Sequence, residues 1–395
     1  MTKYFIKQVA WSAVKLFLFI TFMFFFIQIV MPGDFITQFS LGCNAACRAR
    51  MRAQLGLDLP LWKRYFHWLG QIVTLDLGNS MSGKPVIDIL KGVIPPTLLV
   101  FLTGTMIAFL IGSWLGKVTA WSKWGLPSRL VTLGGLTLFT SFPPWLAWLV
   151  TYAVGRGAGF VVMGEIGGLR QVSFQNLDRE LWQGVEIEPN AVIMKMLAIF
   201  FLSVLVFAGI KRLLEQVTKT RMQGIVFLIL IPVWTVAGWD MLGIATYAFD
   251  IMRLAYLPLL TYILLSFGET MLIMQASLRE VKKSEYIKTA RAKGLPDSLV
   301  RDRHAVRNAI LPVLSRLVIS LPYLLTGVVI IESSLDWPGM GTNMWNSLYW
   351  QNMPVVMNTL LLVGILSLAA RLILDILGAY LDPRIRHRES KVNIG

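Results

Sequence analysis

The amino-acid sequence predicts an all-α protein that crosses a membrane several times. Hydrophobic residues fill 55% of its 395 positions and the mean hydropathy is +0.63, well beyond the range of a soluble domain. Eight apolar runs are each long enough, at about 20 residues, to cross roughly 30 Å of hydrocarbon as a helix. The runs are residues 9–31, 97–118, 130–154, 191–210, 224–246, 254–275, 313–334 and 355–380.

The first run follows Lys3 and Lys7, as the core of a secretory signal does. It is longer than such a core and has no small-residue cleavage site, so we expect residues 1–31 to remain as a membrane helix. An extracytoplasmic segment, residues 32–94, follows it. This segment contains Cys43 and Cys47 in the sequence CNAAC, which could close a disulfide in an oxidising compartment; the alternative is two small buried residues.

Residues 78–84, GNSMSGK, match the start of a phosphate-binding loop, and the preceding IVTLDL is typical of the strand before one. That loop needs a hydroxyl after its lysine to hold magnesium, but this chain has Pro85 there. The segment is also expected outside the cell, where ATP is scarce. We therefore predict no motor in this chain, and active transport would draw on another subunit or on an ion gradient.

The basic residues determine the expected orientation. A net charge of +15 would suit nucleic acid, but the basic residues concentrate in alternate loops, which the positive-inside rule places in the cytoplasm. These cytoplasmic regions are 117–129, 211–221, 279–307 and the tail, 387–395 with the residues just before it. Segments 155–190, which is mainly acidic, and 335–354, which has no Lys or Arg, are expected outside. Eight helices then leave both termini in the cytoplasm.

The most informative cytoplasmic segment is residues 285–312. Glu285 to Lys293 has helix-forming residues with an acidic first turn and a basic last turn, and Gly294 suits a left-handed cap. We expect Pro296 to begin a second helix, which Pro312 ends at Leu311. A rigid charged helix in which Ala290 and Ala292 allow close approach suits insertion into a partner's cleft; the alternative is an ordinary solvated loop.

Metal and covalent chemistry are not expected. The chain has three histidines, at 67, 304 and 387, and its two cysteines, which the predicted topology scatters over both sides of the membrane. We predict no metal site, no catalytic residues and no cofactor bound by this chain.

Several short motifs occur in a characteristic order. They are Pro32-Gly33-Asp34, LGLDLPLWKRYFHWL (55–69), LDLGNS (75–80), Pro96-Thr97-Leu98, Phe142-Pro143-Pro144-Trp145, YIKTARAKGL (286–295), RHAVRNAILP (303–312), WPGMG (337–341) and LDPRIR (381–386). With them the chain resembles the B-type permease subunits of the oligopeptide/dipeptide family of bacterial ABC importers. The resemblance covers about 1–153 and 254–386. It implies a six-helix importer core within a permease domain at 95–386, into which residues 155–253 insert a helical hairpin and an external loop.

The resemblance also implies that the coupling loop, residues 276–312, docks on an ATPase. Carried over by motif position, the coupling residues are Glu285, Thr289, Ala290, Arg291, Ala292, Lys293, Gly294, Leu295, His304 and Asn308. Lys288 stands where many importers have glutamate, so Glu285, one helical turn earlier, is the expected substitute for that acid.

The partners implied by the resemblance are a second permease in a heterodimer, two cytoplasmic ATPases that bind ATP and Mg²⁺, and an extracytoplasmic solute-binding protein. The protein would sit among the lipids of the bacterial cytoplasmic membrane as a multi-pass subunit and would not bind nucleic acid. The aromatic residues of 32–94 and 335–354 could receive the binding protein, or they could anchor the helices at the membrane interface. These are Trp62, Trp68, Trp337, Trp345, Tyr349 and Trp350.

Glu269 lies inside an apolar run, where an ionisable side chain is costly and marks a candidate transport pathway. It could meet a positive group of the cargo, or it could bond between helices. Gln275, near the end of the same run, is the second candidate pathway residue.

The expected function is alternating-access import of di- or oligopeptides. Relatives that import oligosaccharides or nickel would share the same architecture. An ion-coupled carrier is a further alternative, but it would need inverted repeats and paired intramembrane charges, and the sequence alone reveals neither clearly. A peptide exporter or a receptor scaffold would keep the docking loop without needing a binding protein.

Overall fold

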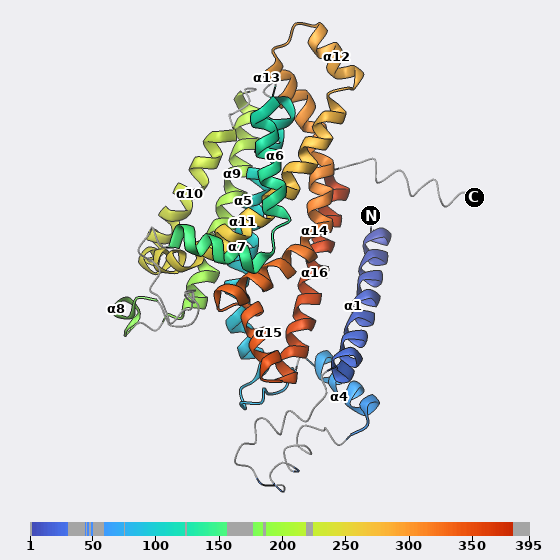
Figure 1. Cartoon of the computed structure of the whole chain (residues 1–395), viewed down its shortest axis with the longest axis vertical. Coiled ribbons are helices and arrows are strands. Elements are labelled where there is room, and N and C mark those ends of the chain that lie inside the picture. The colour runs from blue at the N-terminus through green and yellow to red at the C-terminus, as the bar shows by residue number, and fades with distance from the viewer. Residues whose placement is uncertain are drawn as a thin grey trace, which may run out of the picture.

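The chain folds into a bundle of long helices that run in roughly one direction, with shorter helices at both ends (Figure 1). The computed structural model describes residues 2–30, 59–74, 76–122, 125–155, 177–184, 187–218 and 224–381, and the single residues 44, 46 and 49. In these ranges the extended pairing is one isolated bridge, between Asn79 and Pro85.

The long helices are α1 (Thr2–Val30), α5 (Val86–Trp121), α9 (Pro189–Thr218), α10 (Gly224–Met241), α11 (Ala245–Val281), α14 (Val306–Leu335) and α16 (Met353–Leu381). The shorter ones are α4 (Leu61–Val73), α6 (Gly125–Phe139), α7 (Pro143–Val150), α8 (Arg179–Trp182), α12 (Glu285–Ala292), α13 (Asp297–Leu299) and α15 (Met340–Tyr349), with π-helical turns at Thr151–Gly155 and Val300–Ala305. By length and composition, α1, α5, α9 and α11 qualify as membrane spans within the described residues, and the bent pair α6–α7 adds a fifth. A polytopic helical protein is therefore confirmed, whereas the count of eight spans stays a prediction.

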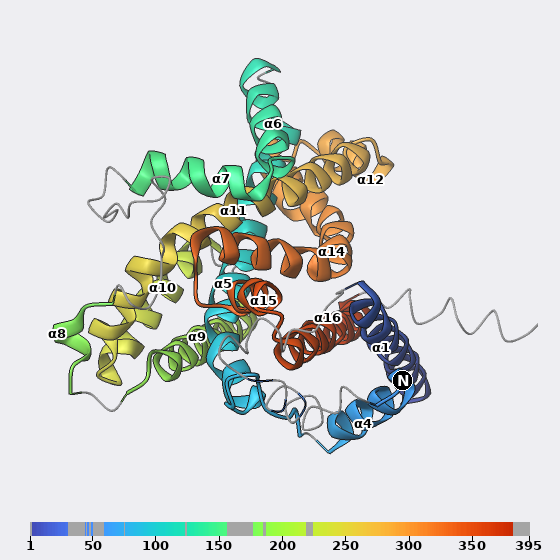
Figure 2. The same ribbon diagram turned by 60° about the horizontal axis from the view of Figure 1, so that its bottom comes forward.

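One predicted span is wrong as a straight helix. Residues 130–154 divide into α6 and α7, which are inclined at 113° (Figure 2). Thr140 and Ser141 bond their hydroxyls back to the carbonyls of Leu136 and Thr137, at 2.9 and 2.6 Å. Phe142 is extended, as the residue before a proline prefers, and Pro143 has no amide hydrogen to continue the ladder. The helix therefore stops and restarts in a new direction.

The most extensive helix contact in the described bundle joins α5 to α11, and it depends on glycine. A Cβ at Gly112 would lie 2.5 Å from the Phe267 carbonyl oxygen, and a Cβ at Gly116 would lie 2.6 Å from that of Met271. Together with Gly104 and Ala108 these positions form a small residue every fourth place, the pattern that lets membrane helices approach closely. The two helices thus form one tightly packed pair.

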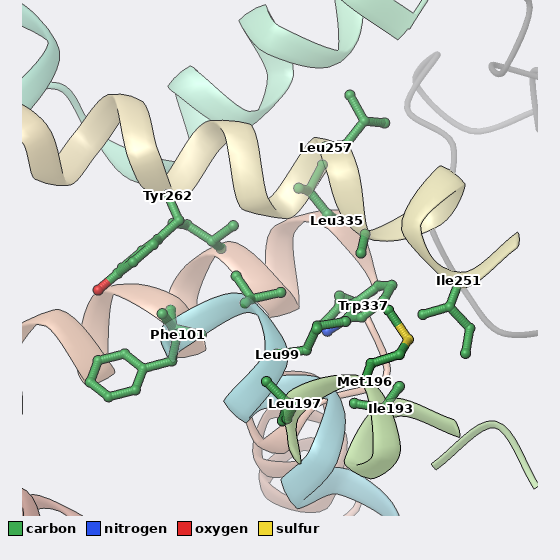
Figure 3. Packing of buried hydrophobic residues seen from close by; sticks show 14 of the residues in the cluster. Leu99, Phe101, Ile193, Met196, Leu197, Ile251, Leu257, Tyr262, Leu335 and Trp337 are labelled. Carbon is green, nitrogen blue, oxygen red and sulfur yellow. The ribbon is translucent and has the colours of Figure 1, made fainter. Parts of the chain in front are cut away.

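The largest hydrophobic core surrounds Trp337, whose side chain is fully buried (Figure 3). Its indole Nε1 donates to the Pro96 carbonyl at 3.1 Å. Leu99 of α5, Ile251 and Leu257 of α11, and Ile193 and Met196 of α9 belong to the same cluster. The start of the predicted hairpin is consequently part of the core, while the exposed apolar side chains Leu202 and Leu205 lie further along α9.

The loops expected on opposite sides of the membrane lie at opposite ends of the bundle. In Figure 1, α12 lies at the upper end, whereas α4, α8 and α15 lie at the lower end. α1 begins and α16 ends toward the end of the bundle that holds α12 (Figure 1). The assignment of that end to the cytoplasm stays a prediction.

Two local predictions are wrong. The expected strand at residues 72–77 is not formed in the described part of the chain, because Ile72 and Val73 are the last residues of α4. The expected helix end at Leu311 is absent, because α14 continues through Pro312. A proline removes one hydrogen bond and costs about 3 kcal/mol within a helix, a penalty that a long helix with buried contacts such as Ala309 and Val313 can offset.

Candidate functional site

The coupling loop contains the predicted short helix. α12 runs from Glu285 to Ala292 and carries a Lys288–Glu285 ion pair at 2.7 Å on its outer side. Gly294 follows it with φ +74° and donates its amide to the Arg291 carbonyl at 2.9 Å. Glycine adopts this left-handed conformation without the steric penalty of a side chain, so the predicted cap is confirmed.

One face of α12 is fixed to the bundle and the other is free. Ile287 and Ala290 are buried among the ends of α5, α11 and α14, in a cluster that includes Trp121 and Leu278. Ala290 was expected to allow close approach of a partner, but it is only 6% exposed. Its small side chain instead allows α12 to approach the bundle closely. The exposed coupling residues are Glu285, Thr289, Arg291, Ala292, Lys293, Gly294 and Asn308, while Leu295 and His304 are partly buried.

Trp121, the last residue of α5, joins three parts of this site. The Lys282 ammonium lies 5.1 Å from its ring centroid, and the Arg291 guanidinium lies 5.4 Å from it. Cations within about 6 Å of an aromatic face are attracted by its quadrupole. Trp121 therefore connects α5 to the end of α11 and to α12. Its only signal in the sequence is an aromatic residue at the end of an apolar run.

Ion pairs join the second half of the loop to its surroundings. Arg301 donates to Asp302 through Nε at 3.0 Å and Nη2 at 2.8 Å, and Lys117 of α5 lies 3.2 Å from the same carboxylate. Hydrogen bonding from Arg301 holds the pKa of Asp302 below its usual range, with Lys117 acting in the same direction and partial burial opposing both. Across the bend, Arg291 pairs with Asp297 at 3.4 Å.

Tyr286 connects the two halves of the loop on its exposed side. Asn308 donates its side-chain amide to the Tyr286 hydroxyl at 2.8 Å, which links α12 to the start of α14. Polar contacts on its exposed side and apolar contacts on its buried side therefore fix the conformation of the loop.

The two candidate pathway residues have different surroundings. Glu269 of α11 accepts a hydrogen bond from Arg316 Nε of α14 at 2.9 Å, an interhelical bond that was one of its two predicted roles. Gln275 is 3% exposed and donates its amide to the hydroxyls of Thr119 and Thr132, which binds α11 to α5 and α6. A cargo could reach Gln275 only after these three helices had moved apart.

A buried carboxylate at the opposite end was missed by the sequence reasoning. Glu332 near the end of α14 accepts the Gly341 amide through Oε2 at 2.7 Å, and a Cβ at Gly339 would lie 2.2 Å from Oε1. The adjoining Met340 amide donates to Thr97 Oγ1 at 2.8 Å. The WPGMG turn is thus fastened both to α14 and to α5.

Several aromatic residues at this end are exposed. Trp62, Trp345, Tyr349 and Trp350 present their side chains to the surface, whereas Trp68 is only partly exposed. Trp337, which was expected with them, is buried in the core and is unavailable to a partner.

The loop that resembles a phosphate site is closed on itself. The amides of Ser80, Gly83 and Val86 bond to the carbonyls of Lys84, Ser80 and Gly78 at 2.8, 2.9 and 3.0 Å. These amides are not directed to a ligand. In the described part of the chain, His, Cys, Asp and Glu form no group of three that could hold a metal. Cys43 and Cys47 lie outside the described residues.

Two family models match the chain. The model described as the inner membrane component of binding-protein-dependent transport systems matches residues 189–387, and the model of the N-terminal part of such membrane components matches residues 1–86. The first match begins with the first residue of α9, so the hairpin that the sequence resemblance treats as an insertion lies within it.

Named relatives align over nearly their whole length. The chain is 26% identical to the oligopeptide transport system permease protein AppB of Bacillus subtilis, over 98% of this chain and 100% of that protein. It is 25% identical to the dipeptide transport system permease protein DppB of Escherichia coli K12, over 94% and 95%. A putative peptide permease of Brucella ovis is 27% identical, over 93% and 94%.

Proposed function

The chain belongs to the family of inner membrane components of binding-protein-dependent transport systems, and on that premise we propose that it is the permease subunit of an ATP-driven importer of short peptides. The names of its relatives support peptides as the cargo. In this proposal it is a multi-pass protein of the bacterial cytoplasmic membrane and performs no covalent chemistry.

The observation that carries the proposal is the two-sided construction of α12. Its inner residues Ile287 and Ala290 are buried in a cluster with residues of α5, α11, α14 and the turn Val300–Ala305, while its outer face is charged and exposed. Such a helix can transmit movement from a partner to the bundle, because its inner residues move with the bundle and its outer residues can move with the partner. We assign that partner to a cytoplasmic ATPase, with Glu285, Thr289, Arg291, Ala292 and Lys293 as the contact residues.

The complete importer would contain this chain, a second permease, two ATPases that bind ATP and Mg²⁺, and an external binding protein. Closure of the ATPases displaces α12, and its fixed inner face carries the displacement to α5, α11 and α14. Packed helices respond by shifting between discrete arrangements and not by continuous deformation. The outward-open arrangement then accepts peptide from a binding protein docked near Trp345 and Tyr349, whose side chains are exposed.

Purification from native membranes followed by reconstitution tests this function. The chain should copurify with two ATPases and a second permease, and proteoliposomes should take up peptide when ATP is inside and loaded binding protein is outside. Stable recovery of the chain alone, with peptide uptake driven by an ion gradient and no ATP, would refute the proposal in favour of a carrier.

A further inference from the structure

The structure pairs two charged residues from different helices within the predicted membrane region. Glu269 lies in α11 and Arg316 in α14, and both fall inside the apolar runs 254–275 and 313–334. Charged side chains at this depth almost always face protein or a water-filled cavity, because exposure to lipid is costly. The surface that carries this pair is therefore not a lipid-facing surface.

The two partners are unequally exposed. Glu269 is 16% exposed and lies back toward the bundle, whereas Arg316 is 53% exposed. Arg316 donates to Glu269 through Nε, and the arginine side chain has five N–H donors in all. The sequence left two roles open for Glu269, an acid that meets the cargo or a bond between helices; the structure shows the interhelical bond, and the more exposed group of the pair is the cation.

One side of α14 is exposed around Arg316. At 100° per residue, Ser315, Arg316 and Ile330 fall on this side within the predicted span, and Asn308 and Pro312 of the coupling loop fall on the same side before it; all five are exposed. On the other side Val313, Val328, Ile331 and Leu335 are buried. α14 packs between α11 and α16 (Figure 2). A side of mixed polar character on a membrane helix suits an aqueous path better than it suits lipid.

We propose that Arg316, held in place by Glu269, binds the terminal carboxylate of a peptide on its way through the importer. This inference rests on the proposed function. A guanidinium matches a carboxylate in both charge and planar geometry. Every linear peptide with a free C-terminus carries that group whatever its side chains, so a permease that reads the terminus can accept many sequences.

Glu269 gives the site a second property. An unpaired arginine within the membrane would bind an anion tightly, whereas the partnered arginine belongs to a nearly neutral pair. A transport pathway needs sites that are favourable enough to enter and weak enough to leave. Glu269 acts here as a positioning residue that orients the guanidinium and limits its hold on the cargo.

The test uses the complete importer in proteoliposomes with one peptide in two forms, one with a free C-terminus and one amidated. Each form is supplied at a saturating concentration of loaded binding protein, so that selection by the receptor does not enter the comparison. In Arg316→Gln we expect uptake of the free form to fall about tenfold, which corresponds to the loss of roughly 1.4 kcal/mol of charged hydrogen bonding. Uptake of the amidated form should stay within twofold. Arg316→Lys should keep part of the preference because it keeps the charge.

The exchange variant Glu269→Arg with Arg316→Glu separates binding from structure. It restores an interhelical ion pair but presents a carboxylate where the guanidinium was. If Arg316 binds the cargo, the exchange leaves uptake of the free form low and does not lower uptake of the amidated form. Recovery of free-form uptake in the exchange variant, or an equal loss of both forms in Arg316→Gln, would overturn the proposal and leave the importer function standing. Failure of the unsubstituted importer to take up either form with ATP would instead refute the proposed function.

Discussion

The Arg291 guanidinium lies 5.4 Å from the ring centroid of Trp121, so that a residue of the exposed coupling helix rests on the last residue of α5. The Lys282 ammonium lies at a similar distance from the same ring. This arrangement ties α12 to a helix that precedes it by more than a hundred residues. In the proposed mechanism it offers a route from the surface of the loop to α5, in addition to the route to α11 through the chain.

Removal of the ring should uncouple ATP hydrolysis from transport. Trp121→Ala deletes two cation–π contacts, each worth about 0.5–1 kcal/mol, and removes the ring from the buried cluster to which Ile287 also belongs. We expect peptide uptake to fall while the ATPase remains active and bound. Trp121→Phe, which keeps an aromatic face, should retain most of the uptake. Equal uptake by Trp121→Ala and the unsubstituted importer would show that the ring does not transmit the movement.

A substitution at Gly294, on the exposed side of the loop, should also reduce peptide uptake while ATP hydrolysis continues. Gly294 has φ +74°, and a Cβ there would meet no atom within 4 Å, so strain comes from the backbone and not from a clash. Gly294→Asp combines about 1 kcal/mol of strain with a negative charge on the docking surface. We expect the complex to assemble and hydrolyse ATP without importing peptide. Gly294→Asn tolerates the same φ without the charge and is the matched control; normal uptake by Gly294→Asp would contradict the coupling role.

The Asp302 ion pairs should contribute to stability down to low pH. Since the folded-state pKa of Asp302 is lowered, its contribution is present above the unfolded-state pKa, about 3.9, and is lost as the pH falls through the lower folded value. Asp302→Asn should therefore lower the thermal transition of the purified complex by the same amount at every pH from 5 to 8. Asp88→Asn, which removes a well exposed partner of Lys91, should change it little. A difference that disappears between pH 6 and pH 5 would show that Asp302 is not held ionised in this way.

The WPGMG turn should tolerate no side chain at Gly341. A Cβ there would lie 2.1 Å from the Val329 carbonyl oxygen, and the Gly341 amide would lose its position against Glu332. Gly341→Ala should destabilise the protein by about 1–3 kcal/mol, which a lower thermal transition in detergent would reveal. In Gly327→Ala, two residues before Val329 in α14, the new Cβ meets nothing within 4 Å, so this variant should be neutral or slightly stabilising. Equal stability of the two variants would contradict the observed packing.

The coupling loop shows how far sequence reasoning reaches. Its helix, its glycine cap and its charged outer face were predictable because they depend on residues within one or two turns of one another. Ala290 was assigned to the wrong side, because its exposure depends on where α5 and α14 lie and not on the residues beside it. Pro312 was read as a helix end for a similar reason: the buried contacts of α14 outweigh a local preference.

The sequence by itself determined the helical membrane class, the position of the loop and the family, since hydrophobic length, loop charge and motif order are properties of contiguous residues. Only the tertiary structure decided that Glu269 faces Arg316, that Gln275 binds three helices together and that Trp337 is buried. Such partners come from distant parts of the chain. Close packing among several helices selects them, and no local pattern records which side chains will meet.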